Sequence, residues 1–259
     1  MDAIVGMPVH LRRRLASALR TGSLVPPYDV MAVTFAIGTS DGADAVAAEL
    51  AGMDREGLSG SGAAGVLERI DMALARVPRP DIVWSGPEVT GIHARDTRQV
   101  LDELIGSART HLLLSSYAFY DGKRAFETLA ARMDAQATLA VTLCLNIQRK
   151  AGDSSAADEV VQRFAELFWK RDWPGKRRPS VFYDPRALEH GGPEGVLHAK
   201  AVVADRRRVL VTSANLTEAA LDRNYELGLV VDDPALASAI AGQFQVLIDR
   251  GLLKPLPEG

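Results

Sequence analysis

The sequence has little of what membrane-spanning, disulfide-stabilised or strongly basic proteins need. Its single cysteine, Cys144, excludes an intramolecular disulfide and fits a reducing compartment. No apolar run reaches the roughly 18 residues that cross a bilayer. The net charge is −3, so any contact with nucleic acid must use a local basic patch. Three arginines, Arg12–Arg14, lie where a signal peptide would be apolar, so we expect a cytoplasmic protein without stable membrane association.

What remains is an ordinary globular composition whose pattern changes at one point. Of the 259 residues, 47% are hydrophobic and 24% charged, which is enough for a sizeable core. The segment Pro78–Pro80 is a stiff linker. Before it the apolar residues recur at helical spacing, and after it strands alternate with helices. We therefore expect a helical N-terminal domain over residues 1–78 and an α/β domain over residues 79–259.

The N-terminal part carries helical segments and no recognisable chemical motif. His10 and Arg12–Arg14 could contact a phosphate backbone, although a solvated helix face is the favoured interpretation. In the second part, a first strand falls at 82–84 or at 89–92. Further strands are expected at 111–118, 138–145, 180–183 and 225–231, and helices at 96–108, 123–133, 153–170 and 234–250.

Residues 196–217 stand out because two β-branched apolar runs flank a charged turn, the pattern of a hairpin. His198 and Lys200 are two residues apart on the first predicted strand, so they share a face. Ser213 and Asn215 have the same spacing on the second strand. Taken singly, each residue also fits a structural role, such as a core histidine or a helix N-cap. Together they place an imidazole, an ammonium, a hydroxyl and an amide over one patch, which suits attack on a phosphate.

This stretch resembles the signature of the phospholipase D superfamily, His-x-Lys-x4-Asp followed by Gly-Ser-x-Asn. The match is His198, Lys200, Asp205, Ser213 and Asn215, with Thr212 in place of the usual glycine. Glu226 falls where the family carries a glutamate that supports the histidine. The resemblance implies an α/β/α sandwich with a mixed central sheet. It also implies that Asp205 is structural rather than reactive.

The chemistry of a phosphodiester indicates what the other residues would do. Neutral His198 can attack phosphorus and form a phosphohistidine, and Lys200 with Asn215 can stabilise the charged oxygens. Glu226 can orient the imidazole, and Ser213 can support the site by hydrogen bonding. We find no Asp/Glu/His cluster at metal-ligand spacing, and we expect neither a metal nor a cofactor.

The acid that protonates the leaving group is missing, because in the family it comes from a second copy of the motif. No other histidine in this sequence is followed by a lysine two residues later. We therefore expect a two-fold homodimer in which the His198 side chains of both subunits share one site. One imidazole would attack while the other, protonated, releases the leaving oxygen.

Two further segments are candidate substrate contacts. Ser115 and Tyr117 end the predicted strand 111–118, where ligands of α/β sheets often bind, although core packing fits them equally well. The segment 170–178 surrounds a tryptophan with cations and is broken by Pro-Gly. It is suited to phosphate contact and base stacking, and equally to a solvated loop. Its candidate binding residues are Lys170, Trp173, Lys176, Arg177 and Arg178.

The helical N-terminal part, the segment Val83–Glu88 and the segment Arg95–Thr97 are similar to the phospholipase-D-like component of DISARM-type bacterial anti-phage systems. That similarity implies a cytoplasmic protein that acts beside a helicase and DNA methyltransferases, with nucleic acid, DNA above all, as substrate. Two alternatives remain open. One is a phospholipase or phosphatidyl transferase, and the other is a non-catalytic assembly subunit that keeps the fold.

Overall fold

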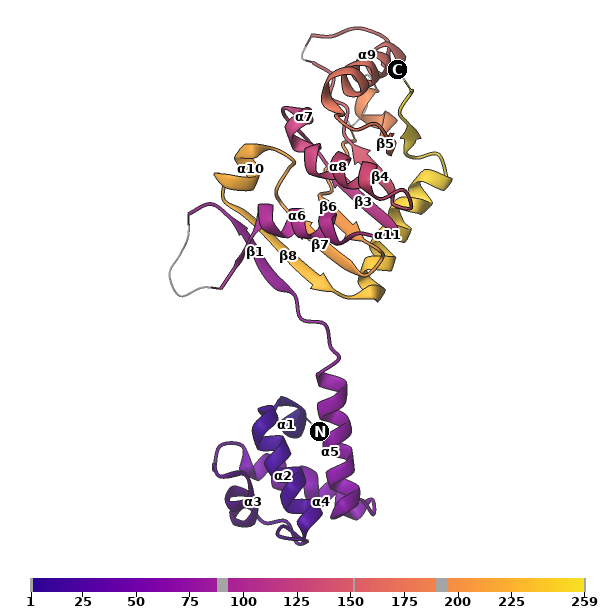
Figure 1. Ribbon diagram of the computed structural model, residues 1–259. Helices are drawn as coiled ribbons and strands as arrows, with labels where there is room; N and C mark the ends of the chain where they lie inside the picture. The colour runs from indigo at the N-terminus through magenta and orange to yellow at the C-terminus, as the bar shows by residue number, and fades with distance from the viewer. Residues whose placement is uncertain (1, 88–92, 151, 190–194, 259) are drawn as a thin grey trace. The chain divides into compact units, whose positions relative to one another are not determined.

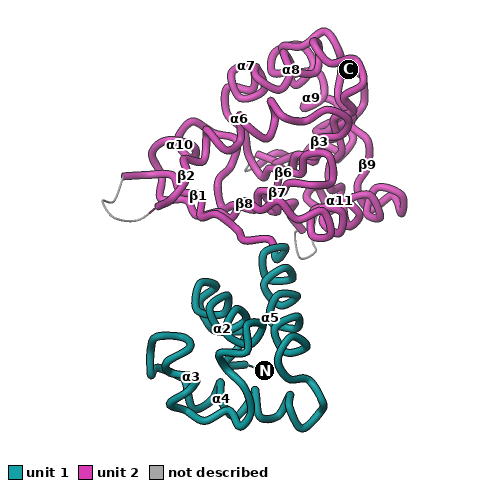
Figure 2. Tube along the Cα trace, turned by 60° about the horizontal axis from the view of Figure 1, so that its bottom comes forward, with its two compact units in different colours: residues 1–77 teal, residues 78–259 magenta. Residues whose placement is uncertain are grey.

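The computed structural model describes residues 2–87, 93–150, 152–189 and 195–258. The chain divides into two compact units, Met1–Val77 and Pro78–Gly259, coloured separately in Figure 2. The division falls at the start of the proline-containing segment Pro78–Pro80. The alternative first strand at 89–92, and the end of the segment that starts at Val83, lie outside the described residues.

The first unit is built from helices alone in its described part. They are α1 (Asp2–Gly6), α2 (Val9–Thr21), α3 (Val30–Ile37), α4 (Ala43–Arg55) and α5 (Ser61–Leu74). The apolar residues that recur at helical spacing form one core, which includes the fully buried Leu15, Leu50 and Leu67. The helical character predicted for this part of the chain is therefore confirmed.

One of the three N-terminal arginines belongs to this core. The side chain of Arg12 is only 3% exposed. Its Nη1 donates to the carbonyl oxygens of Ile4 at 2.7 Å, Val5 at 2.9 Å and Met7 at 2.8 Å, while its Nε donates to Asp71. Arg12 thus satisfies the free carbonyls at the end of α1. It is neither a phosphate contact nor part of a solvated face.

The second unit is organised around a nine-stranded mixed sheet in the order β2-β1-β8-β7-β6-β3-β4-β5-β9. Strands β3, β4 and β5 are parallel, β1 is parallel to β2, and the remaining neighbours are antiparallel. The strands are β1 (Asp81–Ser85), β2 (Arg95–Asp96), β3 (His111–Ser116), β4 (Ala140–Leu145), β5 (Ser180–Tyr183), β6 (Ala201–Ala204), β7 (Arg208–Thr212), β8 (Glu226–Asp232) and β9 (Lys254–Pro255).

Helices cover both faces of this sheet, which makes the predicted α/β/α sandwich (Figure 1). The helices are α6 (Thr97–Ser107), α7 (Gly122–Ala125), α8 (Glu127–Ala135), α9 (Ala157–Leu167), the π-helix η1 (Phe168–Asp172), the 3-10 helix η2 (Pro185–Leu188), α10 (Glu218–Asp222) and α11 (Pro234–Asp249). Because successive side chains of a strand point to opposite faces of the sheet, one strand contributes residues to both hydrophobic cores. Leu112 and Leu114 of β3 pack with α6, α8 and α9, whereas Leu113 packs with α11.

Strand direction brings four chain segments to one edge of the sheet. β3 and β7 end there, while the antiparallel β6 and β8 begin there. We call this the site edge. The predicted hairpin is confirmed, but its strands are shorter than expected, because β6 begins only at Ala201 and β7 ends at Thr212, before Ser213 and Asn215. His198 and Lys200 therefore lie in the irregular segment that leads into β6.

Candidate active site

The side chains of His198 and Lys200 are in direct contact at the site edge. The Lys200 ammonium lies 3.2 Å from each ring nitrogen of His198 and donates to the carbonyl oxygen of the same residue at 2.9 Å. Lys200 is only 8% exposed, whereas His198 is open to solvent. Burial lowers the pKa of Lys200, and the charge of Glu226 opposes that shift. The cation is therefore poorly hydrated beside an accessible imidazole.

Three neighbouring elements fix the segment that carries this pair. Ser115, at the end of β3, donates its hydroxyl to the carbonyl oxygen of Ala199 at 2.9 Å. The Thr212 amide of β7 donates to the Lys200 carbonyl oxygen at 3.2 Å. The side chain of Asn146, just beyond β4, accepts from the Leu197 amide at 3.2 Å. Ser115 was predicted as a substrate contact, but its buried hydroxyl is used to position the residues around His198.

Tyr117 lies against the imidazole. The two ring centroids are 4.7 Å apart with planes inclined by 58°, and the Lys200 ammonium is 5.7 Å from the centre of the Tyr117 ring. Both distances fall in the range of favourable aromatic and cation–π contacts. The structure therefore places Tyr117 at the predicted site, where it restrains the orientation of His198.

Asn215 lies on the other side of Lys200. Its side-chain oxygen accepts from the Ala118 amide at 3.3 Å, and it lines a small cavity together with Lys200 and Ser115. Because the oxygen is used, the amide group of Asn215 is the part left for a ligand. Lys200 and Asn215 are thus brought together, as the motif predicts.

Glu226 makes its hydrogen bonds to residues other than His198, the partner expected from the sequence. Ser213 donates its hydroxyl to one carboxylate oxygen of Glu226, and the Asn224 amide group donates to the other at 3.3 Å. Among the described residues Glu226 makes no hydrogen bond to His198. The antiparallel register explains this, because the Ser213 amide donates to the Leu227 carbonyl oxygen and so places Ser213 between the two strand ends. Glu226 acts on the site through Ser213 and through its charge near Lys200.

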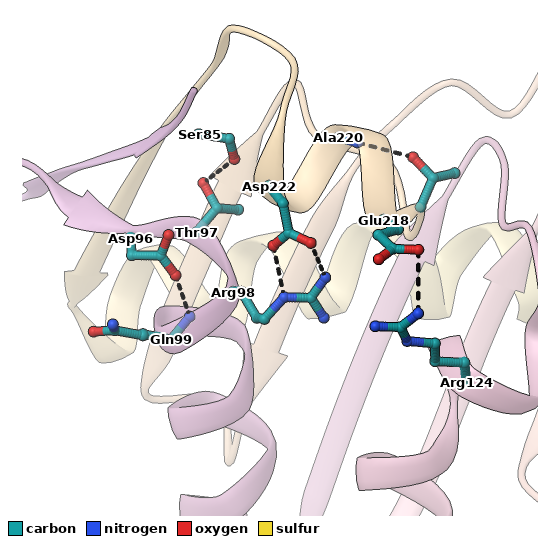
Figure 3. Close-up of polar contacts among 10 residues, drawn as sticks. Ser85, Asp96, Thr97, Arg98, Gln99, Arg124, Glu218, Ala220 and Asp222 are labelled. Atoms are coloured by element: carbon teal, nitrogen blue, oxygen red, sulfur yellow. Dashed lines mark hydrogen bonds and ion pairs between the residues drawn. The ribbon is translucent and has the colours of Figure 1, made fainter. Parts of the chain in front are cut away.

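The segment after Asn215 is held by ion pairs to neighbouring helices. Thr217 caps α10 by accepting from the Ala220 amide at 3.1 Å. Figure 3 shows Arg98 of α6 bound to both carboxylate oxygens of Asp222, at 2.7 and 2.6 Å, and Arg124 of α7 bound to Glu218 at 3.2 Å. These contacts restrain the segment between β7 and α10, which carries Asn215.

Asp205 lies at the opposite end of β6, in the hairpin turn. Its carboxylate accepts from the amides of Arg109, Thr110 and His111, and from the Thr110 hydroxyl at 2.9 Å. Burial alone would raise the pKa of Asp205, but these hydrogen bonds lower it below its ordinary value. The residue ties the turn to the start of β3 and is remote from His198.

The predicted basic substrate loop is not at the site. Trp173 is only 6% exposed, packs against Phe126 and Phe168, and donates its indole N–H to the Arg177 carbonyl oxygen at 2.8 Å. The prediction that Trp173 stacks on bases is therefore wrong. Arg177 donates to the carbonyl oxygens of Met133 and Gln136 and so supports the turn before β4.

The other cations of this segment have local roles too. Lys170 pairs with Glu166 at 3.8 Å, and Arg178 stacks on Trp169 at 4.6 Å. The backbone amide of Lys176 donates to Asp134 at 2.9 Å, while its side chain is exposed. The segment leads into the start of β5, which is parallel to β3, so it approaches the edge opposite the site edge. These residues are not brought to His198.

In residues 2–87, 93–150, 152–189 and 195–258, no group of three or more His, Cys, Asp or Glu side chains is arranged to hold a metal ion. Within the same ranges no helix combines the length and apolarity required of a membrane span. Cys144 is buried, and burial raises the pKa of its thiol to about 12, so it has no place in the chemistry.

Comparison with solved structures finds chains of similar architecture. The phospholipase D family member Nuc from Salmonella typhimurium is 17% identical, with 69% of this chain and 97% of that chain covered and a TM-score of 0.44. NucT from Helicobacter pylori is 17% identical over 66% and 96% of the two chains, with a TM-score of 0.46. Phosphatidylserine synthase from Haemophilus influenzae is 17% identical over 74% and 46%, with a TM-score of 0.47.

No curated protein matches the sequence. The family model described as "Cardiolipin synthase, PLD-like domain" matches residues 101–248, which is more than half of the chain. The matched range contains the His198–Lys200 pair, Asn215 and Glu226. On this match, the chain belongs to the phospholipase-D-like family of phosphodiester-acting proteins.

Proposed function

We propose that this protein is a nuclease that cleaves phosphodiester bonds of nucleic acid without a metal ion, through a phosphohistidine at His198. The observation that carries the proposal is the contact between exposed His198 and poorly hydrated Lys200, which lines a small cavity together with Asn215. An imidazole is a good neutral nucleophile, and a desolvated ammonium stabilises charge on phosphate oxygens more strongly than a hydrated one.

The reaction proceeds in two displacements. A ring nitrogen of His198 attacks phosphorus, an N–P bond forms, and the bond to the leaving oxygen breaks. A protonated group gives its proton to that oxygen. Water then attacks phosphorus, loses a proton to the same group, and the N–P bond breaks. Lys200 and the amide of Asn215 bind the non-bridging oxygens in both steps.

The protonated group is His198 of the partner subunit in a two-fold dimer. This sequence has one copy of the motif, and a two-fold dimer is the simplest assembly that brings a second imidazole to the site. A two-fold axis at the site edge would present the same residues from both sides.

An exposed apolar surface next to the site supports this assembly. Ile82, Val211 and Leu229 lie in one row across β1, β8 and β7, and Leu227 extends the row toward the site edge. All four are 44–55% exposed, whereas Val209 and Val231 farther along the same strands are covered by α11. Such surfaces are typical of protein–protein contacts. A second copy placed here would cover the row and bring its own site edge close.

A phospholipase or phosphatidyl transferase is the second candidate, because the matching family model is described as a cardiolipin synthase domain. The discriminating experiment incubates the pure protein with labelled DNA, RNA and phosphatidylcholine vesicles in EDTA. We expect cleavage of DNA and none in the His198→Ala variant. Release of choline without cleavage of nucleic acid would replace the nuclease with the lipid enzyme.

The setting we propose is the cytoplasm of a bacterium, within a DISARM-type defence system. The support is the resemblance of the N-terminal helices and of the segment Arg95–Thr97. We expect phage restriction by the complete system to be lost with His198→Ala. Full restriction by a His198→Ala, Lys200→Ala double variant would instead favour a non-catalytic assembly subunit.

A further inference from the structure

A polar cleft of about 500 Å³ opens next to Tyr117, whose ring lies against the imidazole of His198. Its lining comes from the end of β3, the chain that follows β4, and the segment that leads to His198. Tyr117 forms the wall nearest His198, and Val196 lies two residues before it. Pockets of this size can hold one small molecule or one unit of a larger ligand. The residues that follow β4, Asn146 to Lys150, were not identified from the sequence.

The cleft is built in advance by Arg149. Its guanidinium donates to the carbonyl oxygens of Asp153 at 3.2 Å and Ser155 at 2.6 Å, and to that of Leu188 at 2.9 Å. These bonds join the chain before α9 to the end of η2, which are two walls of the cleft. A binding site that is already formed loses less conformational entropy when a ligand enters.

One wall contains a buried donor without an acceptor. The Asn146 side chain uses its oxygen to accept from the Leu197 amide, but its Nδ2 group is buried and has no hydrogen-bond acceptor among the described residues. A buried donor in this state costs free energy, and it is usually explained by a bound water or ligand. Asn146 is 6% exposed and lines the cleft.

The charges of the lining leave one cation available. Lys150 is exposed, and its ammonium makes no ion pair with any described residue. Of the two carboxylates in the lining, Asp153 pairs with Arg163 at 2.5 Å, and Glu189 interacts with Arg186. Gln148 is exposed and adds both a donor and an acceptor. The cleft therefore offers a cation and amide donors rather than an apolar groove for acyl chains.

We propose that this cleft binds the nucleotide next to the scissile phosphate of a single-stranded nucleic acid, a statement that rests on the proposed nuclease function. Lys150 binds the phosphate of that nucleotide, and the amides of Asn146 and Gln148 bind its polar edges. A nucleotide enters such a cleft only when it is free of duplex stacking, which selects single strands. Tyr117 then separates the bound nucleotide from the reacting imidazole.

The experiment measures the binding of a short fluorescent oligodeoxythymidylate to the full chain as a function of salt. All variants are made in a His198→Ala background so that the ligand is not consumed. Lys150→Ala is compared with the matched control Lys176→Ala, an exposed lysine that lies toward the opposite sheet edge. Asn146→Asp keeps the acceptor for Leu197 and removes the free donor.

We expect Lys150→Ala to weaken binding on the order of fivefold and to reduce the salt slope by about 0.7, the effect of one lost phosphate contact on a single strand. Asn146→Asp should weaken binding as well, and Lys176→Ala should stay within about twofold of the parent. Equal effects of Lys150→Ala and Lys176→Ala would overturn the proposal. Lys150-dependent binding of phosphatidylglycerol vesicles, with no binding of the oligonucleotide, would also overturn it.

The binding experiment and the test of the proposed nuclease function can give opposite results, so failure of one is distinguishable from failure of the other. Binding is measured without turnover, so a cleft that binds oligonucleotide stands even if no diester is cleaved. If, instead, bis(p-nitrophenyl) phosphate is hydrolysed in a His198-dependent way but Lys150→Ala has no effect on oligonucleotide binding, the phosphodiesterase stands and the cleft assignment is wrong.

Discussion

The ammonium of Lys200 lies 3.2 Å from both ring nitrogens of His198, so in the free protein it competes for the lone pair that would attack phosphorus. A bound phosphate offers Lys200 stronger, charged acceptors. The substrate would then draw the ammonium away and free the nucleophile. Lys200 would thus lower the reactivity of the imidazole in the free protein and bind the phosphate when substrate is present.

This dual role predicts opposite effects of Lys200→Met on two reactions of His198. Turnover of bis(p-nitrophenyl) phosphate should fall about 100- to 1,000-fold, as for the loss of a group that stabilises developing charge. Modification of His198 by diethyl pyrocarbonate should become faster, because the ammonium no longer competes for the lone pair of the imidazole. Parallel loss of both reactivities would show that Lys200 only maintains the geometry.

The contact between Tyr117 and His198 predicts a positioning role that depends on the ring and not on the hydroxyl. Tyr117→Leu should lower kcat for bis(p-nitrophenyl) phosphate by about tenfold with little change in KM, because a misoriented nucleophile costs rate rather than ground-state binding. Tyr117→Phe should restore kcat. A change in KM alone, or no rescue by phenylalanine, would contradict the assignment.

The hydrogen bonds of Asp205 predict a pH-dependent contribution to stability. The residue has a positive φ of 52°, a conformation that asparagine also tolerates, so Asp205→Asn removes the charge at little conformational cost. We expect a loss of about 1–2 kcal/mol in denaturant-induced unfolding at neutral pH. Asp232→Asn, which breaks the exposed ion pair with Arg207, should cost no more than about 1 kcal/mol.

The sign of this pH dependence follows from the lowered pKa of Asp205. The stabilisation is complete above the unfolded pKa, about 3.9, and is lost as the pH falls through the lower folded pKa. The stability difference between the wild type and Asp205→Asn should therefore stay constant down to about pH 5 and shrink in more acidic solution. A difference that grows on acidification would be incompatible with this account.

The buried Arg12 predicts a local loss of stability in the first unit. Arg12→Met leaves three carbonyl oxygens without their donor and the Asp71 carboxylate without its buried partner, which should cost about 3–5 kcal/mol. Hydrogen exchange on the full chain should lose protection in residues 1–77 and retain it in residues 78–259. Arg13→Met on the same helix is the control, because the Arg13 side chain is 75% exposed and makes only a 3.5 Å ion pair with the other oxygen of Asp71, so it should cost no more than about 1 kcal/mol.

Much of the fold could be predicted because local patterns decide it. The β-branched runs of the hairpin, the capping residue Thr217 and the proline that begins α11 all specify their elements within a few residues of sequence. The start of β6 could not be placed, because the residues from Val196 have the same apolar pattern as a strand. Hydrogen bonds from Ser115 and Asn146, both distant in sequence, hold this segment instead.

The errors in the predicted site have the same origin. The loop at 170–178 has the composition of a nucleic-acid contact, but the hydrophobic packing of Trp173 on Phe168 outweighs any exposed role. The partner of Glu226 depends on the pairing of β7 with β8, which no short motif contains. Asn146 and Lys150 could have been found by the reasoning that selected Tyr117, because they too follow the carboxyl end of a parallel strand.

The most direct measurement is to trap the covalent intermediate. The pure protein is mixed with a phosphorus-labelled oligonucleotide in EDTA, quenched in alkali, and the labelled peptide is mapped by mass spectrometry. We predict an alkali-stable, acid-labile phosphoryl group on His198 that is absent from the His198→Ala variant. In the wild type, the labelled fraction should be larger when the reaction is quenched early in turnover than after the substrate is consumed. Steady cleavage of the oligonucleotide with no label on His198 at any time would contradict the account.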